Sequence, residues 1–259
     1  METALEIKNL TRKYGSYYAV NNISIQVKKG EIFSFLGVNG AGKTTSIKMI
    51  VGILKPTSGS IHICGHNVQS DARKAKMITG YIPDRPYMYA KLTGREFIKF
   101  VAELYSVPSK LIHSRGDELI EKFGLMQWAN DLIENYSHGM KQRLATAAAL
   151  IHDPQVLIID EPMVGLDPRG AKLLKDSLRE YAEQGKSIFL STHSLNVAEE
   201  LSDRMAIIQQ GQILSVGSLD QVREQASRSP DEKLESVFLE LTSEMTKPQT
   251  VDANEHRAV

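Results

Sequence analysis

Hydrophobic and polar residues alternate in short runs through the first third of the chain, which is the pattern of half-buried β-strands. Glycine and proline residues separate these runs, as turn residues do. One stretch differs, because the apolar positions between Lys43 and Leu54 follow the spacing of an amphipathic helix. The predicted strands cover residues 5–10, 24–27, 32–36 and 61–64.

The middle of the chain, from Asp84 to about Asp153, has helical rather than strand periodicity. Thr93 and Glu96 have the spacing of a capping box, in which each side chain bonds the other residue's backbone N–H. An apolar run at helical spacing begins directly afterwards, at Phe97. This region is therefore predicted to be a helical subdomain inserted into the β-containing part.

Strand and helix patterns alternate again after this region. A strand, a helix and a second strand in succession imply a parallel sheet, and two strand-like runs around Gly211 predict a hairpin. From about residue 243 the sequence is polar and is expected to be disordered. The predicted elements are strands at 156–159 and 187–191, a helix from Pro168 to Gln184 that Gly185 ends, and hairpin strands at 205–208 and 213–216.

Composition narrows the classes of partner. With 42% hydrophobic residues in a chain of 259, there is enough apolar material for a substantial core. The 31 basic and 31 acidic residues balance, so no nucleic-acid partner is expected. Cys64 is the one cysteine and is predicted to pack rather than react. No apolar run approaches the roughly 18 residues of a membrane span, so the chain is not expected to cross a bilayer by itself.

The segment between the third predicted strand and the helix at Lys43 fits a phosphate-binding loop, G-x-x-x-x-G-K-[ST]. Glycines let the backbone N–H groups surround phosphate oxygens, and the helix N-terminus adds partial positive charge. Lys43 would neutralise the β and γ phosphates of a nucleotide, and the Thr44 hydroxyl would bind Mg²⁺. A plain glycine-rich turn is the alternative. The loop reads Gly37, Val38, Asn39, Gly40, Ala41, Gly42, Lys43, Thr44 and Thr45.

Two carboxylates end the predicted strand at residues 156–159. Open α/β sheets bind ligands at the carboxyl ends of their strands, where Asp160 and Glu161 would lie. Asp160 would hold Mg²⁺, and Glu161 would orient or deprotonate the water that attacks the γ-phosphate. Strands often end in acids that only face solvent, so this assignment depends on the phosphate loop.

The segment from Tyr136 to Arg143, followed by Asp153 and Pro154, resembles the signature segment of ATP-binding cassette (ABC) transporter proteins. The resemblance extends over about residues 5–217. Three further positions take their roles from it. Tyr14 is similar to the aromatic residue that stacks on adenine, Asp167 to the loop that couples two nucleotide sites, and His193 to the switch histidine at the γ-phosphate.

The resemblance implies an α/β fold, with a P-loop NTPase core containing a parallel sheet, an antiparallel β subdomain and an inserted helical subdomain. The nucleotide-binding domain would span residues 1–242, with the helical subdomain at about 85–153 and a polar tail at 243–259. Such proteins work in pairs, identical or different, with ATP held between the phosphate loop of one copy and the signature of the other. Ser137 and Gly139 would thus serve a neighbour's nucleotide, and Ser137 would also cap the helix that follows it.

The implied activity is ATP hydrolysis that drives a separate transmembrane permease from the cytoplasmic face. Three positions depart from the family pattern: His138 replaces a glycine, Met140 a glutamine, and Asp84 the glutamine that senses Mg²⁺ and water. These variants, with the apolar end segment 234–241, resemble the exporter-like branch and favour export. A soluble ABC ATPase and a slow ATP-binding regulator are the alternatives.

Several of these positions also have ordinary structural interpretations. Tyr17 and Tyr18 compete with Tyr14 for the adenine. Asp167 precedes Pro168 and would cap the next helix whatever its other role. Trp128 is predicted to belong to the core of the helical subdomain. Residues 83–89 form a kinked, tyrosine-bearing segment, and the resemblance makes it the expected contact for a permease.

Overall fold

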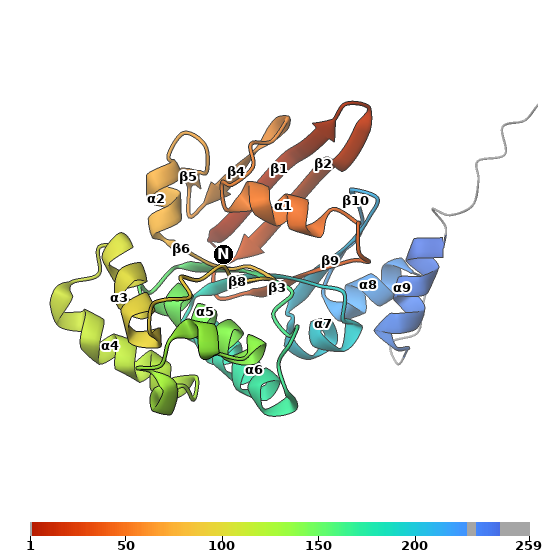
Figure 1. Ribbon diagram of the computed structural model, residues 1–259. Helices are drawn as coiled ribbons and strands as arrows, with labels where there is room; N and C mark the ends of the chain where they lie inside the picture. Colours follow the sequence, from red (N-terminus) through yellow and green to blue (C-terminus); the bar gives the residue numbers. More distant parts are fainter. Residues whose placement is uncertain (1, 227–231, 244–259) are drawn as a thin grey trace, which may run out of the picture.

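Two β-sheets and two groups of helices form layers in the computed structural model, which describes residues 2–226 and 232–243 (Figure 1). The six-stranded sheet has the order β10-β9-β3-β8-β7-β6, and its strands from β9 to β6 are parallel. This confirms the predicted parallel sheet, while β9 and β10 form the predicted hairpin around Gly211. The strands are β3 (Ile32–Leu36), β6 (Thr79–Ile82), β7 (Val156–Asp160), β8 (Ser187–Thr192), β9 (Arg204–Gln209) and β10 (Gln212–Gly217).

The second sheet is antiparallel and has the order β2-β1-β4-β5. Its first two strands are much longer than the predicted segments, because they pair along their whole length around a turn at Gly15. Bulges interrupt the register and with it the apolar alternation, which hid the full length of these strands from the sequence pattern. The strands are β1 (Thr3–Tyr14), β2 (Tyr17–Lys28), β4 (Ser58–Ile63) and β5 (His66–Asn67).

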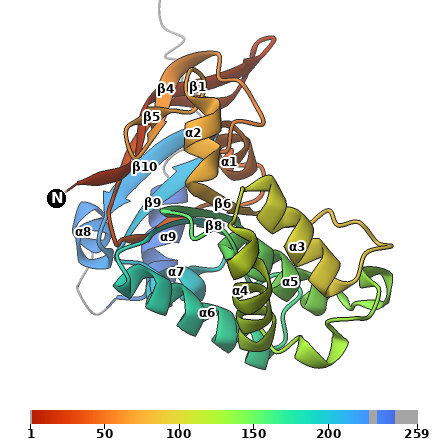
Figure 2. The same cartoon turned by 90° about the vertical axis from the view of Figure 1, so that its left-hand side faces the viewer.

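Helix α1 lies between the two sheets, and other helices cover the opposite face of the six-stranded sheet (Figures 1 and 2). Helix α1 is shorter than predicted, because Gly52 takes a left-handed conformation just past the end of the helix. The helices are α1 (Lys43–Ile50), α2 (Ala72–Met77), α3 (Gly94–Leu104), α4 (Ser109–Lys122), α5 (His138–Leu150), α6 (Pro168–Glu183), α7 (Leu195–Leu201), α8 (Leu219–Gln225) and α9 (Leu234–Ser243), with 3₁₀ turns at Met126–Trp128 and Ile133–Asn135.

Alternate residues of the central strands face different cores. Phe33 and Phe35 point toward α1 and the antiparallel sheet, while Ile32 points toward the helical side. In the same way, Ile158 packs on the side of α1 and the antiparallel sheet, and Ile159 packs on the helical side. Because both faces of the sheet are covered, its strands are apolar on both sides, which explains their uninterrupted hydrophobic runs.

The predicted helical subdomain consists of α3, α4, α5 and the two 3₁₀ turns. The capping box at the start of α3 is confirmed, since Thr93 accepts a bond from the Glu96 backbone and Glu96 returns one. Trp128 lies on a 3₁₀ turn, partly buried against this core, as expected. No helix among the described residues is long and apolar enough to span a bilayer. The predicted polar tail lies outside the described residues except for Ser243, the last residue of α9.

A cluster of packed side chains connects the helical subdomain to the six-stranded sheet. The Tyr105 ring stacks on the His152 imidazole with 3.7 Å between the ring centres. His152 Nε2 lies 3.2 Å from the carbonyl oxygen of Thr79, at the start of β6. Beside it, the Asp153 carboxylate pairs with Arg115 of α4 at 3.4 Å and with Lys186 at 3.1 Å. Burial is the main cause that lowers the pKa of His152 to about 4.

This shift predicts a pH-dependent stability. Between pH 6.5 and about 4 the unfolded chain binds a proton at His152 that the folded chain does not, so stability is complete above this window and falls as the pH falls through it. The variant His152→Phe keeps a stacking ring but has no titrating group. Between pH 7 and 4.5 we expect its unfolding free energy to fall by about 2 kcal/mol less than that of wild type. Urea titrations at several pH values measure this difference.

The matched control is His113→Phe, because His113 is exposed on α4. We expect this variant to follow the wild-type pH dependence. Parallel loss of stability in wild type and His152→Phe would show that His152 does not carry the effect.

Candidate functional site

The predicted phosphate loop joins β3 to α1, and two of its glycines, Gly37 and Gly42, lie where no side chain fits. A Cβ on Gly37 would stand 2.5 Å from the carbonyl oxygen of Ile208, and one on Gly42 2.5 Å from that of Ala19. Gly40 and Gly42 have φ values of 83° and 110°, a region that glycine adopts without strain. The loop is therefore closely packed against β9 and β2.

The Lys43 ammonium folds back into this loop. Lys43 Nζ donates to the carbonyl oxygen of Gly37 at 2.7 Å and lies 3.3 Å from that of Val38. It also lies 3.4 Å from Glu161 Oε1, and its side chain is only 6% exposed. A buried ammonium requires such partners.

Asp160 and Glu161 leave the end of β7 in different directions. Asp160 is buried and accepts a hydrogen bond from Ser191 Oγ of β8 at 2.5 Å. Burial raises the pKa of Asp160, while hydrogen bonds from Ser191 and Thr44 act in the opposite sense. Glu161 has a φ of 51°, an uncommon value for a residue with a side chain. The two carboxylates thus occupy different environments.

The Glu161 carboxylate lies between two nitrogen groups. Its Oε2 is 2.9 Å from Nδ1 of His193, and its Oε1 is the atom near Lys43. The Glu161 side chain is 13% exposed and that of His193 is 54% exposed. The structure thus brings together all three residues predicted as catalytic. A carboxylate held in this way is able to accept a proton from water.

A cleft of about 370 Å³ opens beside the loop. Tyr14, Tyr17 and Tyr18 are the three candidates for the residue that stacks on adenine. Tyr14 and Tyr17 line this cleft, and Tyr18 does not. Asp84 reaches the cleft from the segment after β6. The lining residues are Tyr14, Tyr17, Ala19, Asn39, Gly40, Gly42, Lys43, Thr44, Thr45, Asp84 and Glu161.

The oxygen atoms at this cleft suit Mg²⁺, which prefers oxygen ligands and keeps several waters. The Thr44 hydroxyl bonds the Asp160 carboxylate, and Asp84 lines the same cleft. Within the described part of the chain, no cluster of three or more His, Cys, Asp or Glu side chains is placed to hold a metal. An Mg²⁺ ion here would therefore also need oxygens from phosphate and water.

The predicted signature residues lie apart from this cleft lining, at the start of α5. Ser137 caps that helix by accepting a bond from the Met140 N–H at 3.2 Å. Asp167 caps α6 in the same way through the Gly170 N–H at 2.9 Å, with Pro168 at the first helical position. Both capping roles agree with the sequence prediction.

The sequence did not reveal two contacts that organise the site. Ser191 Oγ bonds Asp160 and also lies 3.3 Å from the backbone nitrogen of Glu161. In the sequence, the only indication of this contact was a serine at the end of an apolar strand. The second contact joins the signature to the loop before α6, since a Cβ on Gly165 would stand 2.0 Å from Cδ2 of His138. The His138 ring therefore covers Gly165.

Comparison with known proteins gives consistent matches. The family model described as ABC transporter matches residues 20–164. The chain is 42% identical over 229 residues to the uncharacterized ABC transporter ATP-binding protein YdbJ of Bacillus subtilis, covering 87% of this chain and 73% of that protein. It is 40% identical over 224 residues to the bacitracin transport ATP-binding protein BcrA of Bacillus licheniformis, covering 86% and 72%.

Solved structures agree in fold. A structure described as the ATP-binding subunit of an ABC transporter superposes with a TM-score of 0.88 at 32% identity, covering 93% of this chain and all of that chain. A dimeric ATP-binding cassette in a post-hydrolysis state with ADP and Pi gives a TM-score of 0.76 at 26% identity, covering 83% and 98%. The predicted α/β cassette fold is confirmed.

The contact between His138 and Gly165 yields a prediction. Gly165 has a φ of 77°, so an alanine there is strained and its Cβ also collides with the His138 ring. We expect Gly165→Ala to lower the unfolding free energy by about 2 to 3 kcal/mol. Adding His138→Ala should remove the collision and recover about 1 kcal/mol. Chemical denaturation measures both.

Gly185→Ala is the matched control, because Gly185 has a φ of 81° with nothing within 4 Å of an added Cβ. It isolates the backbone strain, for which we expect about 1 to 2 kcal/mol. Equal losses in Gly165→Ala and Gly185→Ala would mean that the His138 ring moves away freely.

Proposed function

Because the chain belongs to the ABC transporter family, we propose that the cleft beside residues 37–45 is the site at which this ATP-binding subunit hydrolyses ATP. A subunit of this kind is an ATPase that powers transport through a separate permease. The observation that carries the assignment is the Glu161 carboxylate, held 3.4 Å from Lys43 and 2.9 Å from His193 beside the cleft.

Each part of the cleft suits one part of Mg²⁺–ATP. The loop N–H groups from Gly37 to Thr45 and the start of α1 would surround the phosphates. Lys43 would exchange its carbonyl contacts for the β and γ phosphates. Thr44 and Asp160 would hold Mg²⁺, with Asp84 facing it. The ion, when bound, neutralises charge on the phosphates.

Hydrolysis would depend on the two groups at the Glu161 carboxylate. Glu161 would orient the attacking water and accept its proton, while His193 would fix the carboxylate by its contact to Oε2. Lys43 would stabilise the negative charge that develops on the γ-phosphate. The carboxylate is mostly shielded from bulk water, which strengthens these interactions.

A complete site would need a second ATP-binding subunit, either identical or different. Ser137 and Gly139 do not line the cleft of their own chain, and the α5 N-terminus carries free N–H groups and a positive dipole end. These groups would meet the γ-phosphate held by the partner. The dimeric cassette that contains ADP and Pi supports this arrangement.

The proposal predicts the behaviour of Glu161→Gln. This change keeps the shape of the side chain and removes the proton acceptor, so we expect Mg²⁺-dependent ATP turnover to fall at least about 100-fold while ATP binding persists. A stable dimer should accumulate with ATP. Turnover assays and light scattering measure the two effects.

Glu183→Gln serves as the control, because Glu183 is exposed near the end of α6 and outside the cleft. It should leave turnover unchanged. Turnover that survives in Glu161→Gln would remove Glu161 from its role. A wild-type chain that binds ATP without turnover, even with membranes, would instead point to a regulator.

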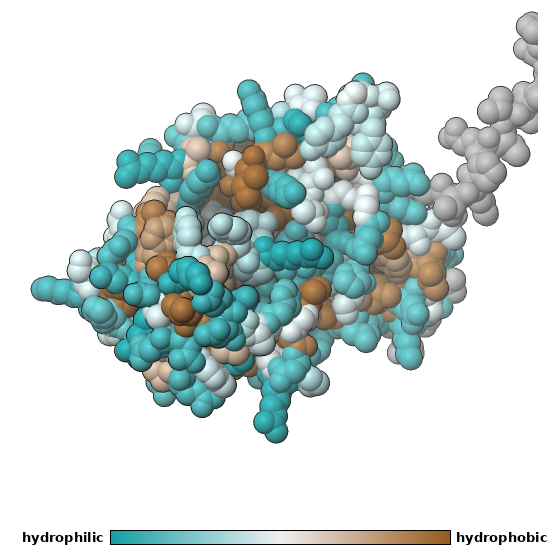
Figure 3. Space-filling view, viewed as in Figure 1, coloured by the Kyte–Doolittle hydropathy of each residue, from teal (hydrophilic) through white to brown (hydrophobic). Residues whose placement is uncertain are grey.

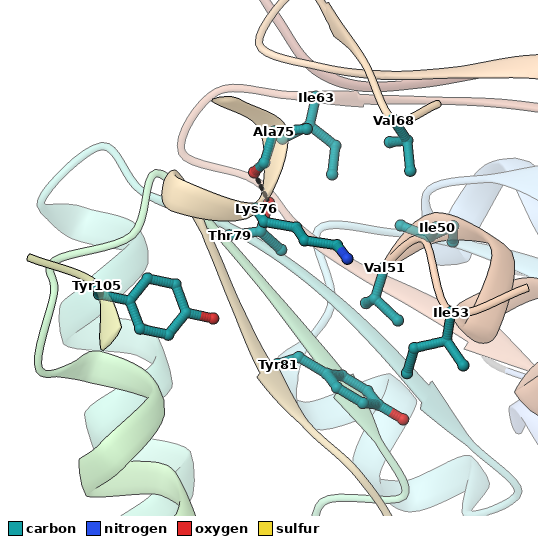
Figure 4. A pocket seen from close by; sticks show the side chains of 10 residues that line it. All are labelled: Ile50, Val51, Ile53, Ile63, Val68, Ala75, Lys76, Thr79, Tyr81 and Tyr105. Atoms are coloured by element: carbon teal, nitrogen blue, oxygen red, sulfur yellow. Dashed lines mark hydrogen bonds between the residues drawn. The ribbon is translucent and has the colours of Figure 1, made fainter. Parts of the chain in front are cut away.

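Two neighbouring apolar pockets form the proposed contact for the permease, which would hold this subunit at the cytoplasmic face of a membrane. The first, of about 170 Å³, lies between α1, α2 and β6, where apolar side chains gather over α1 (Figures 3 and 4). The second, of about 140 Å³, lies where residues 83–88 pass the helical subdomain. Tyr81 and Tyr105 line both pockets, so the two pockets adjoin, and we refer to them together as the groove.

Exposed side chains at the groove support docking. Tyr87 is 87% exposed although it lines the second pocket, and Ile53 is an exposed residue of the first. Exposed apolar side chains around a groove are typical of a protein interface. We propose that transport through the permease is export. The sequence variants at His138 and Asp84 support this direction, as does the transport role in the name of the bacitracin relative.

The docking proposal predicts that substitutions in the groove weaken membrane association and leave ATP binding unchanged. Ile53→Glu with Tyr87→Glu should reduce co-sedimentation with membranes of the source cell at least about tenfold, because hot-spot side chains contribute most of an interface's free energy. ATP binding by the isolated chain should not change. Leu239→Glu is the control, since Leu239 is also exposed but lies on α9. Equal co-sedimentation of all three proteins would exclude this groove as the docking surface.

A further inference from the structure

The end of β1, which carries Tyr14, is fixed by the loop that follows α1. The Thr57 N–H donates to the carbonyl oxygen of Thr11 at 2.8 Å, and the Lys13 N–H donates to Thr57 Oγ1 at 3.0 Å. Arg12 Nη1 donates to the carbonyl oxygen of Lys55 at 2.9 Å. These three contacts hold both the backbone before Tyr14 and the guanidinium of Arg12.

The Arg12 guanidinium stands over one face of the Tyr14 ring, with 4.4 Å between its carbon and the ring centroid. Tyr14 lines the nucleotide cleft, whereas Arg12 is not among the residues that line it. Arg12 Nε is buried and has no hydrogen-bond partner among the described residues. The guanidinium is thus held against the ring, and its contact with Lys55 fixes its position.

We propose that Arg12 is a positioning residue for the base of the bound nucleotide. This inference rests on the proposed nucleotide site and extends it beyond the phosphates. Tyr14 is 48% exposed, so without a contact its ring would be free to rotate. Cation–π contact on one face holds the ring, and the other face remains available for a flat, aromatic base.

A second pair on the same strands provides an internal comparison. Lys13 Nζ stands 4.7 Å from the centroid of the Tyr18 ring, but Tyr18 does not line the nucleotide cleft. Tyr17 does line the cleft, and no cation lies over its ring in the described part of the chain. Of the three tyrosines, Tyr14 alone combines a place at the cleft with a fixed ring.

The test is calorimetric titration of the full-length chain with ADP and with inorganic tripolyphosphate, which lacks a base. We expect Arg12→Ala to raise the ADP dissociation constant about three- to tenfold and to leave tripolyphosphate binding unchanged. Arg12→Lys should recover part of the loss, because it restores the charge without the planar group. Lys13→Ala should bind ADP as wild type does.

A double-mutant cycle with Tyr14→Ala decides whether Arg12 acts through the ring. In the Tyr14→Ala background, Arg12→Ala should add no further loss of ADP binding. An unchanged ADP constant, an equal loss for tripolyphosphate, or additive losses in the cycle would each overturn the proposal. If Arg12→Ala does not fold, Arg12→Gln is used instead, because its longer side chain keeps part of the packing of the arginine stem while it removes the charge.

Lys43→Ala separates this inference from the nucleotide site on which it rests. If ADP binding depends on Lys43 and not on Arg12, the phosphate site stands and the positioning role fails. If wild type binds ADP no better than Lys43→Ala does, the proposed nucleotide site itself fails.

Discussion

The buried ammonium of Lys43 sets the conditions for the rest of the site. A charge that is 6% exposed needs partners, and two loop carbonyls together with Glu161 provide them. Glu161 follows β7, whereas Lys43 follows β3, and β8 lies between these strands. The parallel order therefore brings a carboxylate to the lysine from more than a hundred residues away. Glycine at position 37 lets the loop pack against the carbonyl of Ile208, while its own carbonyl accepts a hydrogen bond from the ammonium.

Two adjacent carboxylates acquire different properties through backbone conformation and burial. Asp160 ends the strand in its regular geometry and is buried against Ser191, with its pKa raised by burial. One residue later the positive φ of Glu161 changes the chain direction, and its carboxylate meets Lys43 and His193. A hydrogen-bonded, buried oxygen set and a partly accessible base thus come from consecutive residues.

Local patterns in the sequence predicted the local features of the structure. The phosphate loop, the capping box at Thr93 and the caps at Ser137 and Asp167 depend on residues within a few positions of one another. Contacts between distant residues carry no such pattern, and the His138 ring on Gly165 is an example. Strand β6 and helix α2 were also missed, because four and six residues are too few to repeat a periodic pattern clearly.

The packing of the phosphate loop has a consequence for how a ligand is recognised. Gly37 and Gly42 lie against the carbonyls of Ile208 and Ala19, so neighbouring strands hold the loop before any ligand arrives. Its conformational entropy is lost when the chain folds, and binding need not order it again. A rigid cradle accepts any triphosphate equally well. Discrimination among nucleobases is then left to residues outside this loop, of which Tyr14, with its ring held by Arg12, lines the same cleft.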